Sequence, residues 1–345
     1  MNNLINKNFI GSPNQLMTLD ESKLVGGFQD GVKIANVHNG GNLEATVLID
    51  RCMDLYQVRY KGVNMNYISP AGIISPQYYN VENKEWLRGF FVGQLTTCGL
   101  QNIGNPFIND NLPLGMHGRI SFAPAENYCS QRIFNQNDNS IILTGHMREA
   151  TLFGENLLLN RRYEFNYKND EILITDTISN NSSTDTKFMY LLHLNFGYPF
   201  LSDKCEISVR SKNVVPRDEH AKDNMDNYDT IPLPSKNFVE CCYFHEMEAD
   251  QEGLTGYCIY NNELDIGVEV EYRLEDLPYF CQWNMFGYNE YVIGLEPMNS
   301  FLDGPKIQDD VDNKIPTIEG YGLRKHEIKL RYFSGRSNYE KIRNQ

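Results

Sequence analysis

The chain has 345 residues, 41% of them hydrophobic, with a formal net charge of −14 at pH 7 and a pI near 5.0. Nucleic acids and anionic membranes attract clustered Lys and Arg, so this acidic balance excludes both from the expected partners. The apolar residues form only short runs, so we expect no membrane-spanning helix, and the N-terminal residues lack the apolar core of a secretory signal, which favours the cytoplasm. None of the eight cysteines forms a Cys-x-x-Cys motif, so we expect reduced, mostly buried thiols.

Short segments in which apolar and polar residues alternate follow one another along the chain, a pattern typical of strands with unlike faces. The clearest is 265–274, where apolar residues alternate with glutamates and an arginine. The full set is 43–49, 54–60, 140–148, 157–167, 171–179, 184–192, 205–211, 238–245, 255–261, 265–274, 279–286, 290–295 and 323–333. This pattern predicts an all-β fold, a large antiparallel β-sandwich with less than about a sixth of its residues in helices. We expect one domain over residues 1–345, with its core at about 40–333.

Two segments interrupt the strand pattern. Residues 70–113 are rich in Gly, Pro and Asn and include an apolar, glycine-punctuated stretch at 86–100. Long irregular excursions in compact domains are usually functional, so we expect this one to lie beside a ligand. The second segment, 214–235, is rich in Pro and Asp and is interpreted as a solvated surface crossover, with the rim of a cleft as the alternative.

Two titratable residues stand next to apolar, strand-like runs. His193 follows one run and precedes the polar Asn195, and Glu296 follows another and precedes Pro297, so both are expected where a strand ends. Imidazole titrates near neutrality and partial burial raises a carboxyl pKa toward the same range, so the two can serve as acid and base. From the residues alone, a surface carboxylate at a strand end is the simpler interpretation of Glu296.

Three motifs resemble those of the galactose mutarotase-like superfamily, the aldose 1-epimerases, and most closely an uncharacterised epimerase-like branch of it. They are Leu-His-Leu-Asn-Phe-Gly at 192–197 after two strand-like segments, Gly-Met-His-Gly-Arg at 115–119, and Tyr-Val-Ile-Gly-Leu-Glu-Pro at 291–297. The resemblance implies a mutarotase-type β-sandwich that interconverts sugar anomers by opening and closing the ring. Each motif alone is moderately specific, and together they span most of the chain.

The resemblance also implies roles for single residues. His193 would be the general acid and Glu296 the general base, on opposite sides of the sugar ring, with no metal and no cofactor. His117 and Arg119 would bind sugar hydroxyls, and Arg51 matches an Arg-x-Met-Asp element of the uncharacterised branch. The first motif departs from the family's Asn-His-Ser-Tyr-Phe-Asn, which puts the choice of sugar in doubt, and the family's substrate-binding aspartate has only Asp303 as a candidate.

Several binding residues have a plain structural alternative. Asn195, Gln282 and Trp283 offer the amide and indole surfaces that sugars use, but Trp283 fits a hydrophobic core nearly as well. Arg51 fits a salt bridge to Asp54 or another acid as well as it fits a substrate contact.

The expected partner is a small-molecule carbohydrate, with no nucleic acid and no membrane, and a homodimer is left open. Two alternatives to an epimerase remain: a carbohydrate-binding protein without turnover, and an isomerase of a sugar acid or sugar phosphate in which Arg51 and Arg119 hold the anion.

Overall fold

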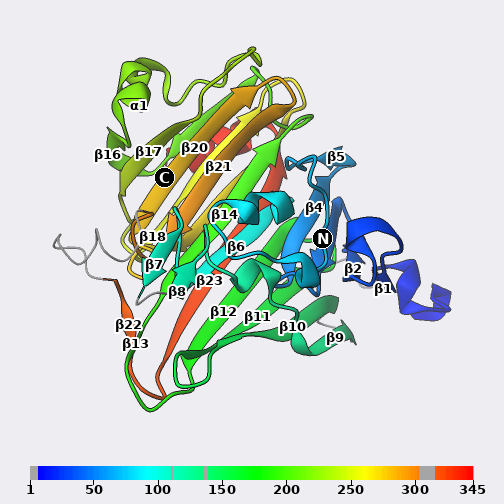
Figure 1. Cartoon of the computed structure of the whole chain (residues 1–345). Coiled ribbons are helices and arrows are strands. Elements are labelled where there is room, and N and C mark those ends of the chain that lie inside the picture. Colours follow the sequence, from blue (N-terminus) through cyan, green and yellow to red (C-terminus); the bar gives the residue numbers. More distant parts are fainter. Residues whose placement is uncertain (1–6, 110–111, 136–138, 303–314, 345) are drawn as a thin grey trace.

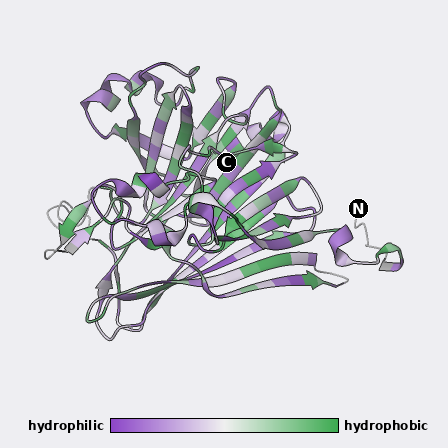
Figure 2. Cartoon of the chain, turned by 45° about the vertical axis from the view of Figure 1, so that its right-hand side comes forward, coloured by the Kyte–Doolittle hydropathy of each residue, from purple (hydrophilic) through white to green (hydrophobic). Residues whose placement is uncertain are grey.

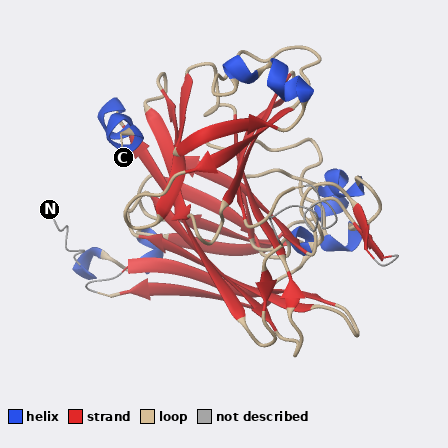
Figure 3. Ribbon diagram, turned by 90° about the vertical axis from the view of Figure 1, so that its left-hand side faces the viewer, coloured by secondary structure: helices blue, strands red, loops and turns tan. Residues whose placement is uncertain are grey.

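The computed structural model describes residues 7–109, 112–135, 139–302 and 315–344. Strands account for 51% of the chain and helices for 11%, so the prediction of an all-β fold with few helices is confirmed. Neighbouring strands in the large sheets pair antiparallel, and Figure 3 shows them in stacked layers with the short helices at the periphery. No helix in the described part of the chain is long and apolar enough to cross a membrane.

Three large sheets make up most of the molecule (Figure 1). The eight-stranded sheet has the order β15 (Cys205–Val209), β18 (Leu254–Asn261), β19 (Ile266–Arg273), β23 (Leu323–Ser334), β12 (Glu171–Asn180), β11 (Asn156–Asn166), β10 (Asn139–Ala150) and β9 (Glu126–Phe134). The six-stranded sheet has the order β16 (Ser211–Pro216), β17 (Cys241–Met247), β20 (Tyr279–Gly287), β21 (Glu290–Met298), β14 (Met189–Gly197) and β6 (Leu95–Leu100). The N-terminal sheet contains β1 (Thr18–Lys23), β2 (Lys33–His38), β3 (Leu43–Leu48), β4 (Asp54–Tyr60) and β5 (Val63–Asn64).

The remaining elements are short. Two two-stranded ribbons pair β7 (Phe107–Asn109) with β8 (Leu112–Leu114) and β13 (Thr186–Lys187) with β22 (Thr317–Ile318). The α-helices are α1 (Glu219–Asp223) and α3 (Arg336–Arg343). The 3-10 helices are η1 (Lys7–Phe9), η2 (Pro13–Gln15), η3 (Gly27–Gln29), η4 (Pro76–Tyr78), η5 (Glu85–Gly89), η6 (Ile120–Phe122) and η7 (Met225–Asn227).

Alternating side chains give the strands their two faces, and Figure 2 shows hydrophobic and hydrophilic residues interleaved along them. In β14, Leu192 and Leu194 point into the main hydrophobic core, which all three large sheets share. Leu191 points to the opposite face of β14 and belongs to a second apolar cluster. His193 has the parity of Leu191, so its side chain projects from the six-stranded sheet away from the main core.

The second apolar cluster attaches the irregular excursion to the outer face of the six-stranded sheet. Trp86 and Phe90 from the η5 region pack there with Cys98 of β6, Leu191 of β14 and Val292 of β21. The glycine-rich segment expected to lie beside a ligand therefore covers the sheet face on which His193 projects. Between this cover and the sheet lies a cavity lined by His117, His193 and Glu296.

Candidate active site

His193 and Glu296 come from adjacent antiparallel strands, β14 and β21. The pairs Leu191 with Met298 and Leu194 with Leu295 share one register, in which His193 lies opposite Glu296. Directly opposite residues have Cβ atoms about 5 Å apart, so their side chains can touch. Both strands continue past these residues, so the expectation that each residue ends a strand is wrong. Pro297 is accommodated inside β21, where it pairs with Phe280 of β20.

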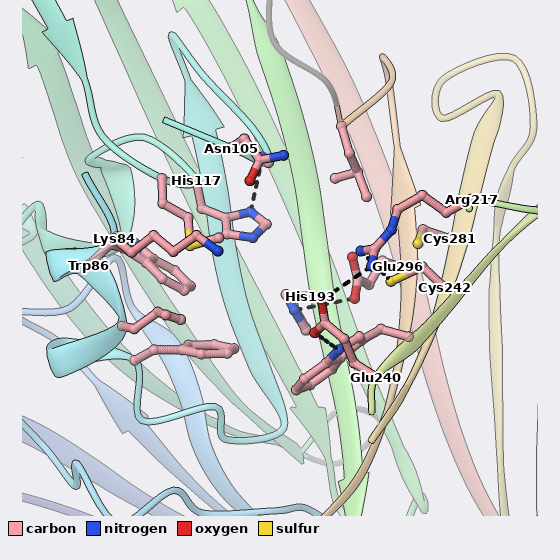
Figure 4. A pocket seen from close by; sticks show the side chains of 16 residues that line it. Lys84, Trp86, Asn105, His117, His193, Arg217, Glu240, Cys242, Cys281 and Glu296 are labelled. Atoms are coloured by element: carbon pink, nitrogen blue, oxygen red, sulfur yellow. Dashed lines mark hydrogen bonds and ion pairs between the residues drawn. The ribbon is translucent and has the colours of Figure 1, made fainter. Parts of the chain in front are cut away.

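The two side chains make direct contact. His193 Nε2 lies 3.2 Å from Glu296 Oε1, and both residues are almost fully buried (Figure 4). Burial raises the pKa of Glu296 to about 8, and burial, together with the nearby His117, lowers the pKa of His193 to about 3. At neutral pH this favours a protonated carboxyl beside a neutral imidazole, since desolvation penalises both charged forms. The two groups lie side by side at 3.2 Å, whereas the resemblance implied a placement on opposite sides of the sugar ring.

Asn195 supports His193 from the same face of β14. Its amide nitrogen donates to the carbonyl oxygens of His193 (2.7 Å) and Val92 (3.2 Å). Its Oδ1 and the Nδ1 of His193 are both buried, and neither atom has a hydrogen-bond partner among the described residues. The Asn195 side chain also partly opposes the lowering of the His193 pKa. Asn195 therefore holds the backbone of β14 at His193, and His193 Nε2 is the ring nitrogen that contacts Glu296.

His117 presents a fixed donor to the cavity. The backbone N–H of Gly104 donates to His117 Nδ1 at 3.3 Å, and burial lowers the pKa of His117 to about 4, so the neutral ring carries its proton on Nε2. Its ring packs against Trp86, with centroids 4.8 Å apart, and lies 5.9 Å from the ring of His193. Gly104 has a φ of +79°, and a Cβ there would meet the Leu302 carbonyl oxygen, so glycine suits this turn.

Consecutive polar contacts form the wall of the cavity that faces His117. Trp283, on β20, has its ring 5.4 Å from the ring of His193, and its indole N–H donates to Glu240 at 2.8 Å. Arg217 donates to the other oxygen of Glu240 at 3.3 Å and to Cys242 Sγ at 2.9 Å. Because both edges of the Glu240 carboxylate are held, the indole face of Trp283 has a fixed orientation toward the cavity.

The cavity enclosed by these walls has a volume of about 150 Å³. Its lining is formed by Lys84, Trp86, Leu87, Phe90, Gly104, Asn105, Met116, His117, His193, Arg217, Glu240, Cys242, Cys281, Trp283, Glu296 and Leu302. In the described ranges, no three His, Cys, Asp or Glu side chains are grouped so that they could hold a metal ion. An acid–base pair, a fixed donor and aromatic faces suit proton transfer on a small polar molecule.

Four of the residues predicted from the sequence do not line this cavity: Asn195, Gln282, Arg119 and Arg51. Asn195 lies behind His193, and Gln282 projects from the other face of β20, where it contacts His245 at 3.2 Å, because neighbouring strand residues alternate in direction. Arg119 is exposed away from the cavity.

Arg51 is buried under the excursion and has a structural function. It donates to the carbonyl oxygens of Ile74, Gly89 and Ser121 at 2.8–2.9 Å. Its guanidinium lies 3.8 Å from the ring centre of Phe122. Arg51 makes no ion pair with Asp54, which pairs with Arg161 instead, and it does not line the cavity.

A family model described as a domain of unknown function, DUF4432, matches residues 29–332. The chain belongs to the DUF4432 family. No protein with a curated description matches this sequence. Among solved structures, a Klebsiella pneumoniae protein provisionally named an aldose 1-epimerase is similar, with a TM-score of 0.91 and 21% identity over 96% of this chain and 88% of that one.

Two further structures show the same fold as this DUF4432 chain. A galactose mutarotase-like protein from Clostridium acetobutylicum has a TM-score of 0.65 and 15% identity, covering 93% of this chain and all of that one. A galactose 1-epimerase from Lactobacillus acidophilus has a TM-score of 0.60 and 14% identity, covering 92% and 99%. The prediction of a β-sandwich of the galactose mutarotase type is therefore confirmed at the level of fold.

Several residues that line the cavity were not predicted from the sequence of this DUF4432 chain. Lys84, Trp86 and Phe90 lie in the segment expected beside a ligand, so their general place could be inferred but not their roles. Arg217 lies within the segment 214–235 and Glu240 shortly after it, so this segment, which the sequence favoured as a surface crossover, borders the cavity. Asp303, the candidate substrate-binding aspartate, lies outside the described residues.

Proposed function

We propose that this protein is an aldose 1-epimerase-like isomerase, which interconverts the anomers of a free or modified sugar by acid–base opening and closure of the ring. The observation that carries the proposal is the 3.2 Å contact between His193 Nε2 and Glu296 Oε1 in the wall of a cavity. The fold shared with mutarotase-like proteins agrees with it, although at 14–21% identity it supports no more than the architecture.

An adjacent acid and base suit this reaction. The anomeric hydroxyl oxygen and the ring oxygen are bonded to the same carbon, so groups in contact with each other can reach both. A base removes the hydroxyl proton, a carbonyl forms as the bond between C1 and the ring oxygen breaks, and an acid protonates the ring oxygen. Rotation about the bond between C1 and C2, followed by the reverse steps, gives the other anomer.

The resting protonation of the pair sets the direction of proton transfer. The carboxyl of Glu296 holds the proton, because burial raises its pKa, and His193 Nε2 is free to accept one. Glu296 would then protonate the ring oxygen while His193 takes the hydroxyl proton, which reverses the roles implied by the family resemblance. After opening, the pair holds the same number of protons with the charges separated, and ring closure restores the neutral pair.

The other walls fit a sugar. The indole face of Trp283, fixed by Glu240, offers an apolar surface for the C–H face of a pyranose. His117 Nε2–H can donate to a hydroxyl or to the carbonyl oxygen of the open form, where negative charge would develop.

Anomer exchange is the direct test. Freshly dissolved pure anomers of a panel of neutral sugars are followed by proton NMR with and without protein, and we expect faster equilibration of at least one. Glu149→Gln is the matched control for Glu296→Gln. Glu149 is also a buried glutamate, and burial raises its pKa to about 7, but it lies outside the cavity lining. Binding of a sugar by calorimetry without any exchange would instead support a carbohydrate-binding protein.

One observation favours a sugar acid or sugar phosphate as an alternative substrate. Lys84 lines the cavity, and its ammonium group makes no ion pair or hydrogen bond within the described residues. Arg51 and Arg119, the anion-binding residues expected for this alternative, do not line the cavity. If the substrate is anionic, Lys84→Met should weaken its binding and leave that of its neutral counterpart unchanged, whereas equal effects on both would exclude an anion contact.

A further inference from the structure

Two cysteines that the acid–base chemistry does not use face the same cavity. Cys242 lies on β17 and Cys281 on the neighbouring β20, and both line the cavity beside Glu296 (Figure 4). The register pairs Cys242 with Trp283, so Cys281 is the diagonal neighbour of Cys242 on one face of the sheet. Both thiols are free in the structure.

A cation lies against the sulfur of Cys242. The guanidinium of Arg217 donates to Cys242 Sγ at 2.9 Å. The interaction with Cys242 and, after it, burial raise the pKa of Cys281, so that Cys281 keeps its proton. Reactive cysteines occur in such electropositive, partly accessible surroundings, and Cys242 faces the cavity.

We propose that Cys242 and Cys281 form a hydroperoxide-sensitive thiol pair in the wall of the cavity, in which Cys242 is the reacting sulfur and Cys281 resolves the product. The thiolate of Cys242 attacks one oxygen of hydrogen peroxide, the O–O bond breaks and hydroxide leaves, so sulfur is oxidised to a sulfenic acid and the peroxide is reduced. The sulfur of Cys281 then attacks Cys242 Sγ, the S–O bond breaks, water leaves and a disulfide forms.

Oxidation would act on the wall that holds the indole. Cys242, Arg217, Glu240 and Trp283 are joined by consecutive contacts of 2.9, 3.3 and 2.8 Å. When Cys242 is oxidised, Arg217 loses its sulfur acceptor, and the orientation of Trp283 that depends on Glu240 changes with it. The pair would thus couple the shape of the cavity to peroxide exposure.

The test uses the whole folded protein, hydrogen peroxide and mass spectrometry, and it needs no sugar. Cys129, which is exposed on β9, is the internal reference. We expect Cys242 to be oxidised at least about tenfold faster than Cys129 and a peptide containing a Cys242–Cys281 disulfide to accumulate. In the Cys281→Ser variant, dimedone should trap a sulfenic acid on Cys242.

Arg217→Met tests the origin of the reactivity. It should slow oxidation of Cys242 by about tenfold while Cys129 is unaffected, and Arg148→Met, which removes a surface arginine, should change neither rate. Circular dichroism and melting temperature confirm that the variants fold. Faster oxidation of Cys129 than of Cys242, or no trapped sulfenic acid in Cys281→Ser, would overturn the proposal. Trapped sulfenic acid without any disulfide in the parent protein would overturn the role of Cys281.

Discussion

His193 and Glu296 together hold one exchangeable proton over a wide pH range. The pKa of His193 is lowered to about 3 and that of Glu296 is raised to about 8, so the pair carries one proton between these values wherever that proton resides. We expect kcat/KM for anomer exchange, corrected for the uncatalysed rate, to be flat from about pH 4 to 7 and to fall about tenfold per unit above 8. A decline below pH 6.5, where an ordinary histidine protonates, would contradict this.

The same shift predicts a pH dependence of stability. The folded protein keeps the Glu296 proton up to about pH 8, whereas the unfolded chain releases it near the ordinary pKa of 4.5. Because the folded state binds more protons in this window, the contribution of Glu296 to the free energy of unfolding decreases as the pH rises from 4.5 to 8. Below pH 6.5 the lowered pKa of His193 offsets this decrease in the parent protein, so Glu296→Gln should flatten the stability profile between pH 6.5 and 8.

Gly294 leaves the space in which the pair and the indole meet. A Cβ at this position would lie 2.8 Å from Glu296 Oε1 and 3.0 Å from both His193 Cε1 and Trp283 Cε3. Gly294→Ala should therefore displace these side chains and reduce turnover about 10- to 100-fold in a folded protein. Gly11→Ala, on the surface, is the control, because a Cβ there would meet only Gln15 Oε1, at an ordinary van der Waals distance of 3.5 Å. Unchanged turnover in Gly294→Ala would show that the packing of the pair does not matter for catalysis.

The excursion that covers the cavity depends on Arg51. Three carbonyl oxygens, from η6, η5 and the segment before η4, accept its hydrogen bonds. In Arg51→Met these buried acceptors lose their donor, and we expect a cost of about 2–5 kcal/mol in the free energy of unfolding. Hydrogen exchange measured by mass spectrometry should show lost protection mainly in residues 74–122. Equal loss in the strands β10–β12 would instead indicate a global effect.

A buried charge network joins the three large sheets. Arg161 of β11 contacts Asp54 of β4 at 2.8 Å and Asp176 of β12 at 2.6 Å, while Thr97 of β6 donates to Asp54 and Tyr190 of β14 to Asp176. Arg161→Met leaves two buried carboxylates without their cation, and urea denaturation should show a loss of about 3–5 kcal/mol. The surface pair of Arg148 and Glu126 is the comparison, and Arg148→Met should cost less than about 1 kcal/mol. A similar small cost for Arg161→Met would refute the structural role of the network.

The architecture of the molecule was predictable from local patterns. Alternation along segments such as 171–179 and 265–274 depends only on which side chains face a core, so the strands and the sandwich followed from it. His193 and Glu296 could be singled out because each follows an apolar, strand-like run within a motif that resembles the mutarotase-like superfamily; from the residues alone, Glu296 fitted a surface carboxylate as the simpler interpretation. Their contact could not be predicted, because it depends on the register between β14 and β21, which are about one hundred residues apart in the chain.

The wrong predictions for single binding residues have a related cause. Gln282 and Trp283 were grouped because they are neighbours in the sequence, but consecutive residues of a strand face opposite sides. Arg51 was grouped with the binding residues because of its Arg-x-Met-Asp match, with a salt bridge as the alternative. Its actual contacts were not foreseen, because a buried arginine that satisfies three backbone carbonyls leaves no signal in the sequence. The Arg217 contact to Glu240 and Cys242 joins residues from the two ends of a loop, which local patterns do not report.

The central claim is that His193 and Glu296 act as one catalytic unit, and a double-mutant cycle on anomer exchange tests it most directly. His193→Asn and Glu296→Gln keep shape and hydrogen bonding but remove the titratable function, so each should lower turnover about 100-fold or more while sugar affinity, measured by calorimetry, is retained. The double variant should be scarcely slower than either single one, because residues that act as a unit are not additive. Near-normal exchange in either single variant, or losses that multiply in the double variant, would contradict the account.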